Sequence, residues 1–109
     1  MTAGLAVFDN REFLEVRILT DLTVRNAAAI RAGILSAWEQ CGRPGRLVLD
    51  LLGARHIDSS GVGALLDVSH RTDGNGVSLI IRGLRRSPRR MLERTGLGKL
   101  FHIEGACAA

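Results

Sequence analysis

The alternation of apolar and polar residues predicts where most strands and helices of this chain lie. Near the N-terminus, "LAVFDNREFLEVRIL" reads as two strands joined by a turn at residues 9–10. In the second strand Leu14, Val16 and Ile18 alternate with charged residues. This period of two is typical of a strand with one apolar and one polar face, so the segment predicts a β-hairpin.

A helix is predicted next, because the apolar residues then recur at helical spacing. Thr23 is suited to be its N-cap residue. Glycines and a proline at residues 42–45 end the pattern. The apolar stripe of this helix consists of Ala27, Ile30, Ile34, Trp38 and Cys41.

The remaining pattern alternates strands with helices. The segments "RLVLDLL" and "VSLIIRG" are nearly all apolar, as expected for strands buried between helices. A last helix is expected from Ser87-Pro88 to Gly96, and "KLFHI" reads as a short final strand. The order β-β-α-β-α-β-α-β predicts an α/β fold, a mixed β-sheet with helices packed against it.

Length and composition are those of one globular domain, which we assign to residues 1–109. The longest apolar runs are far too short to span a bilayer, and no signal peptide is visible. We therefore expect a cytoplasmic protein that does not associate with a membrane. Cys41 and Cys107 lack metal-ligand spacing and read as ordinary thiols, although the sequence leaves a disulfide between them open.

The stretch "ARHIDSSGVGALLD" places an acid, two hydroxyls and two glycines where a buried strand passes into a helix. Asp58 or Ser59 is suited to cap the first N–H groups of that helix. Gly61 and Gly63 each cost the helix about 1 kcal/mol relative to alanine, and close approach of another backbone is one reason to tolerate that cost. With Gly63 and Ala64 expected on the outer face, the first turn would be shallow and bare. Two interpretations stay open here: a helix cap alone, which is the commoner case, or a hydroxyl presented to another protein.

Positive charge is concentrated near the C-terminus. The net charge is +4, and residues 82–99 hold six arginines and one lysine against the single acid Glu93. No aromatic residues are interleaved for base stacking, and no nucleic-acid motif accompanies the charge. We therefore favour a solvated helix face or the rim of a protein contact over specific nucleic-acid binding.

The segment "LVLDLLGARHIDSSGVGALLDV" resembles the core of a STAS domain, in particular that of the bacterial anti-sigma-factor antagonists. The resemblance extends over nearly the whole chain, since the order of elements matches and "RRMLERTGLGKLFHI" is similar to the last helix and strand of the family. It implies a STAS-like single domain.

The resemblance also implies a role for the residues of the motif. The phosphoacceptor of the family directly follows the aspartate, which here makes it Ser59. The family carries a Gly-Glu-Leu-Asp-like stretch before the first helix, where this chain has Thr20, Asp21, Leu22 and Thr23. Asp21 keeps one acid, whereas the two threonines depart from the pattern. The implied partner-binding residues are Asp21, Thr23, Asp58, Ser60, Gly61, Val62, Gly63 and Ala64.

The mechanism implied by the family is partner switching. The unphosphorylated protein binds an anti-sigma factor that is also a serine kinase and thereby frees a sigma factor. Phosphorylation of Ser59 releases the complex, and a serine phosphatase resets it. The sequence shows no phosphate-binding loop and no metal-ligand cluster, and His56 is a lone histidine of the kind that is usually structural, so we expect neither an enzyme nor a cofactor. The alternative is a STAS scaffold or interaction subunit of a stress-signalling or lipid-trafficking complex, or of an anion transporter.

Overall fold

The predicted order of elements is confirmed by a computed structural model, which describes residues 4–10 and 12–104, the side chains of residues 97 and 100 excepted. A 3-10 turn, η1, precedes the last strand. The elements are β1 (Leu5–Asp9), β2 (Leu14–Ile18), α1 (Ala27–Gln40), β3 (Arg46–Asp50), α2 (Ser59–Asp73), β4 (Ser78–Arg82), α3 (Arg86–Thr95), η1 (Leu97–Leu100) and β5 (His102–Glu104).

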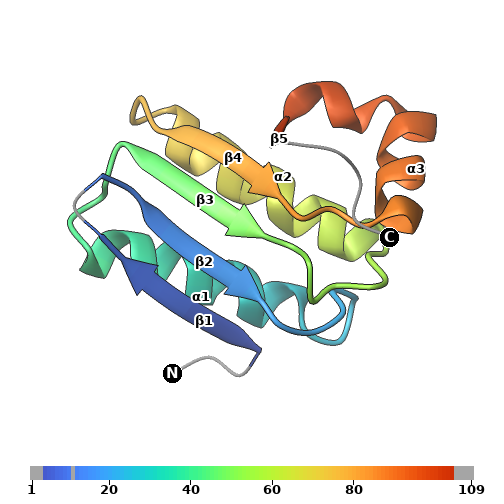
Figure 1. Ribbon diagram of the computed structural model, residues 1–109, viewed down its shortest axis with the longest axis horizontal. Coiled ribbons are helices and arrows are strands. Elements are labelled where there is room, and N and C mark those ends of the chain that lie inside the picture. Colours follow the sequence, from blue (N-terminus) through green and yellow to red (C-terminus); the bar gives the residue numbers. More distant parts are fainter. Residues whose placement is uncertain (1–3, 11, 105–109) are drawn as a thin grey trace.

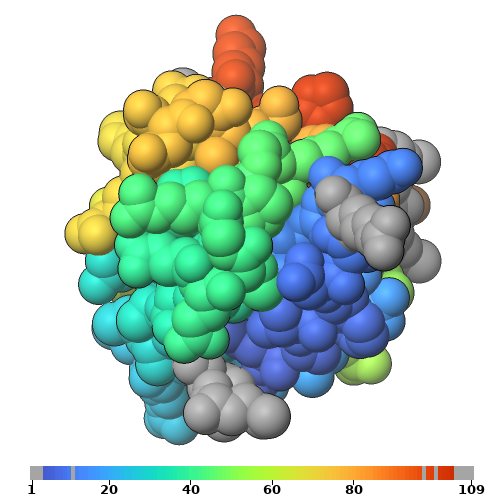
Figure 2. Space-filling model, turned by 90° about the vertical axis from the view of Figure 1, so that its left-hand side faces the viewer, coloured from blue at the N-terminus to red at the C-terminus, as the bar shows by residue number. Residues whose placement is uncertain are grey.

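The five strands form one mixed sheet in the order β1-β2-β3-β4-β5 (Figure 1). Strand β1 pairs antiparallel with β2, and the other neighbours are parallel. Because β2, β3 and β4 run in one direction, the loops that leave their carboxyl ends gather at one end of the sheet, on the right in Figure 1. In α/β sheets binding sites concentrate at this end. The opposite end, where β3 begins, faces the viewer in Figure 2.

Helices α1 and α2 lie side by side behind the sheet and enclose the main core (Figure 1). The stripe predicted for α1 is confirmed, since Ile30, Ile34 and Trp38 are buried. The Trp38 indole Nε1 donates to the Pro44 carbonyl oxygen at 3.0 Å, which ties the end of α1 to the start of the next strand. Burial of these large side chains supplies the hydrophobic stabilisation that holds α1 on the sheet.

The expectation that helices cover both sides of the apolar strands is wrong. No helix of the described residues covers the front of β2 and β3, which face the viewer in Figure 1. Glu15, expected on a polar face of β2, is only 6% exposed. Its carboxylate pairs with the Arg17 Nε at 2.7 Å and with the Arg82 Nη1 at 2.8 Å. Strand β3 lies between β2 and β4, so the pair between Glu15 and Arg82 crosses over it. Val48 of β3 is therefore buried, at 2% exposure, beneath a layer of ion pairs.

The start of α1 also differs from the prediction, since the helix begins at Ala27 and not directly after Thr23. The Asn26 side chain accepts from the Thr23 N–H at 3.0 Å and donates to the Asp21 carbonyl oxygen at 2.7 Å. These bonds hold residues 23–26 as a separate turn before the helix. Cys41, just after α1, is a free thiol; Cys107, the other half of the possible disulfide, lies outside the described residues.

Candidate functional site

Of the two residues that the sequence offered as caps, Asp58 and Ser59, Asp58 is the N-cap residue of α2, and it also holds a second loop. Its Oδ1 accepts from the Gly61 N–H at 2.9 Å, and its Oδ2 accepts from the Val24 N–H at 3.0 Å. These two backbone bonds lower the pKa of the Asp58 carboxyl below its ordinary value. One ionised side chain thus caps α2 and fixes the β2–α1 loop beside it.

Asp21 makes the reciprocal connection. It lies in the β2–α1 loop, and its Oδ1 accepts from the backbone N–H groups of Arg55 and His56, at 3.0 and 3.1 Å. Between the two carboxylates, Leu22 and Ile57 form an isolated parallel bridge. The two loops are therefore joined along their length, and an acid from each satisfies backbone groups of the other.

Gly61 marks the closest contact between these loops. A Cβ atom on Gly61 would lie 2.4 Å from the Leu22 carbonyl oxygen, a distance that real Cβ atoms do not reach. The close backbone approach that the sequence offered as a reason for the glycines is thus confirmed here. Close backbone approach does not explain Gly63, because a Cβ atom added to Gly63 would have no atom from another part of the described chain within 4 Å.

Ser59 occupies the first position of α2 and is exposed, whereas Ser60 is half-buried. Ser59 is therefore accessible to solvent at the carboxyl end of the sheet. Ser60 faces a shallow groove between α1 and α2 with a volume of about 360 Å³. We call this the α1–α2 groove; its lining residues are Val24, Ala27, Ala28, Arg31, Ser60, Gly63, Ala64 and Asp67.

The residues predicted to form the surface around Ser59 divide into two groups. Ser60, Gly63 and Ala64 line the α1–α2 groove, whereas Gly61 and Val62 are buried and do not line it. The expectation that Ala64 lies on the outer face is wrong, since it is only 8% exposed and lines the groove between the two helices. Small side chains at this helix contact keep the groove open above it.

Thr20 and Thr23 belong to the framework of the β2–α1 loop. The Thr20 hydroxyl donates to the Asp21 carbonyl oxygen at 3.2 Å. The Thr23 carbonyl oxygen accepts from the Asn26 and Ala27 N–H groups at 3.0 and 2.8 Å. Both residues shape the turn that carries Asp21.

Sequence reasoning missed Val24. This side chain is 73% exposed, lines the α1–α2 groove, and its N–H is the one held by Asp58. An exposed apolar side chain beside an open groove is a feature of protein-binding surfaces. Its signal in the sequence is slight, since Val24 is one of three apolar residues in the loop, with Leu19 and Leu22.

The described residues contain no group of three or more His, Cys, Asp and Glu that could hold a metal ion. Within the same part of the chain, no helix is both long enough and apolar enough to cross a membrane. The features observed at this end of the sheet are an exposed Ser59, a shallow groove and a pair of joined loops.

Comparison with known proteins identifies the family. The family model for the STAS domain matches residues 6–108. This chain belongs to the STAS domain family. The family and the fold therefore agree with the resemblance seen in the sequence.

Solved STAS structures resemble this one at low sequence identity. An anti-sigma factor antagonist from Mycobacterium paratuberculosis has a TM-score of 0.81 at 22% identity, covering 94% of this chain and 85% of that one. The phosphorylated form of the Bacillus cell fate determinant SpoIIAA has a TM-score of 0.68 at 22% identity, covering 93% of this chain and 91% of that one. The murine anion transporter Slc26a9 has a TM-score of 0.72 at 18% identity, covering 88% of this chain but only 16% of the transporter. These similarities are of fold.

Proposed function

We propose that this STAS domain is an anti-sigma-factor antagonist of the cytoplasm that acts by partner switching. The unphosphorylated form binds an anti-sigma factor with serine kinase activity and frees a sigma factor. Phosphorylation of Ser59 ends the interaction, and a serine phosphatase restores it. The observation that carries the proposal is the exposed Ser59 side chain at the first position of α2, beside the open α1–α2 groove.

The surroundings of Ser59 support a role as substrate and ligand, without catalysis by this domain. Asp58 already accepts two backbone hydrogen bonds, so its carboxylate is engaged in holding the loops. In this proposal the kinase supplies ATP, the metal ion and the base, while the groove and Val24 supply the contact area. Asp21 and Asp58 position that surface, and Ser60 and Gly63 form part of it.

A phosphoryl group on Ser59 would act on the interface more than on the fold. It carries about −1.5 to −2 charges near neutral pH. The first turn of a helix favours negative charge, so α2 should tolerate the group. A docked protein, however, would have to desolvate it next to the Asp58 carboxylate. We therefore expect a weakened interface on an intact domain.

Phosphate incorporation at Ser59 tests the proposal. The protein is incubated with ATP and each anti-sigma-type serine kinase encoded in its own genome, and the phosphopeptides are mapped by mass spectrometry. Ser59→Ala should abolish incorporation, while the matched variant Ser60→Ala should be modified like the wild type. Unchanged incorporation in Ser59→Ala, or loss only in Ser60→Ala, would remove Ser59 from this role.

The second candidate is a STAS module that acts only by binding, as a scaffold or as part of an anion transporter. The fold similarity to Slc26a9 over 88% of this chain favours it. A scaffold needs no modified serine, so the same experiment separates the two. Absence of phosphate from every kinase tested, together with a stable complex that does not change with ATP, would favour the scaffold.

A further inference from the structure

A second, strongly basic concavity lies on the other side of the β3–α2 loop. Two of its residues come from that loop and the others from α3 or the residue before it. Its volume is about 800 Å³, more than twice that of the α1–α2 groove. We call it the arginine pocket; its basic lining residues are Arg55, His56, Arg85, Arg86, Arg90 and Arg94.

Most of this charge is not neutralised from within the part of the chain that the structure describes. Arg55, Arg86, Arg90 and Arg94 are exposed, and none of them makes an ion pair or hydrogen bond through its side chain there. Arg85 is held at the base of the pocket, where its Nε donates to the Leu52 carbonyl oxygen at 2.6 Å. The acid at this pocket, Glu93, has its carboxylate 3.5 Å from the Arg89 Nε.

The spacing of these arginines suits a row of carboxylates. Arg86, Arg90 and Arg94 follow one another at four-residue intervals on α3, about 6 Å apart along the helix axis. Acidic residues four apart on a partner helix, or two apart on an extended segment, repeat at nearly the same distance. Among the described residues, no Phe, Tyr or Trp side chain lines the pocket, so a nucleic acid would find no large aromatic platform for base stacking.

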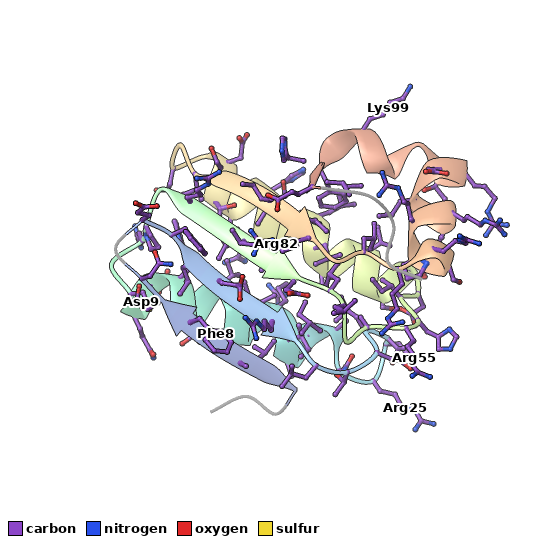
Figure 3. All side chains as sticks on the ribbon, in the orientation of Figure 1. Phe8, Asp9, Arg25, Arg55, Arg82 and Lys99 are labelled. Carbon is purple, nitrogen blue, oxygen red and sulfur yellow. The ribbon has the colours of Figure 1, made fainter. Side chains whose placement is uncertain are left out.

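The arginine pocket is also joined to the Ser59 site by short, fixed backbone. Arg55 and His56 precede Asp58 in the same loop, and their N–H groups are the two held by Asp21. Figure 3 shows Arg55 at the end of the molecule where α3 stands, whereas Lys99 projects from the far side of the α3–η1 segment. The pocket and Ser59 therefore border the same loop, whose backbone is held in place by Asp21.

We propose that the arginine pocket binds an acidic segment of the same protein that docks at Ser59. The identity of that partner rests on the proposed function. The chemistry of the pocket rests on its own residues. The pocket would extend the docking surface beyond the α1–α2 groove and speed association by electrostatic attraction.

The test uses a fluorescein-labelled peptide with glutamates at four-residue intervals, followed by fluorescence anisotropy. Arg86→Glu combined with Arg90→Glu should weaken binding by about tenfold or more. The matched control combines Arg46→Glu and Lys99→Glu, two exposed residues outside the pocket, which change the net charge equally. Its affinity should fall by no more than about threefold. Arg55→Glu, on a different element, provides a second variant should the pair on α3 disturb that helix.

Three results would overturn the inference. Equal weakening by both charge-reversed pairs would mean attraction to net charge alone. Absence of peptide binding to the wild type at low salt would mean that the pocket has no affinity for carboxylates. Tighter binding of a labelled DNA duplex than of the peptide, retained at physiological salt, would assign the pocket to nucleic acid. Ser59→Ala should bind the peptide like the wild type, so failure of the pocket and failure of the phosphorylation switch give different results.

Discussion

The α1–α2 groove and the arginine pocket share the β3–α2 loop but are shaped by different forces. The groove depends on close backbone contact, with Gly61 against the Leu22 carbonyl and Asp58 bonded to both loops. The arginine pocket depends on long side chains that carry charge on an exposed helix face. The comparison teaches that added bulk should disrupt the first surface, whereas only a change of charge should disrupt the second.

The largest effect is expected from Gly61→Ala. The new Cβ would meet the Leu22 carbonyl oxygen, which is backbone and cannot turn aside, so the joined loops would have to separate. We expect a loss of about 2 kcal/mol or more in the free energy of unfolding, measured by urea denaturation.

Gly63→Ala is the matched control for that variant, in the same helix two residues later. Its Cβ would enter open space, so the free energy of unfolding should stay unchanged or rise by up to about 1 kcal/mol. Equal stability of the two variants would show that the loops can move apart at little cost, and that the groove is not held by this contact.

The next effect in size separates the interface from the fold. Ser59→Glu should weaken binding to the anti-sigma partner by about tenfold, because the partner must desolvate a new charge beside Asp58. Its melting temperature should stay close to that of the wild type, since the first turn of a helix accepts an acid. Calorimetric titration and thermal unfolding measure the two quantities. Wild-type affinity in this variant would show that charge at residue 59 does not control the groove surface.

The smallest effect concerns the hydrogen bonds that join the loops. In Asp58→Asn the side-chain amide can still accept from Gly61, but its NH2 group would face the Val24 N–H, which also donates. Asp21→Asn is the matched control, because one oxygen of Asp21 accepts both of its bonds and an amide oxygen can do the same. We expect a lower melting temperature near pH 7 for Asp58→Asn and little change for Asp21→Asn.

The effect of Asp58→Asn should also depend on pH. The folded-state pKa of Asp58 is lowered, so its ionised form contributes stability above the unfolded value of about 3.9 and loses it as the pH falls through the folded value. The difference in melting temperature between wild type and Asp58→Asn should therefore be full above about pH 5 and shrink below about pH 4. A difference that stays constant down to pH 2 would mean that the charge of Asp58 does not hold the loops.

Much of the fold could be read from the sequence because it depends on local patterns. The period of two in β2, the helical stripe in α1 and the acid before Ser59 each act within a few residues. Strand and helix order followed from them, and so did a helix cap at Asp58 or Ser59, of which the structure has Asp58. The candidate site was predicted in the same way, since a strand that passes into a helix through Asp-Ser-Ser-Gly places its hydroxyls at the carboxyl end of the sheet.

Only the tertiary structure decided which residues far apart in the chain contact one another. Glu15 is buried because Arg82, 67 residues away, reaches it across β3. Asp21 and Asp58 hold each other's loops across 34 and 35 residues, and nothing in either local sequence indicates that exchange. Gly61 and Gly63 look alike in the sequence, yet only Gly61 has a backbone against it. Periodicity reports which face of an element is apolar, whereas the neighbour that covers that face depends on how the whole chain packs.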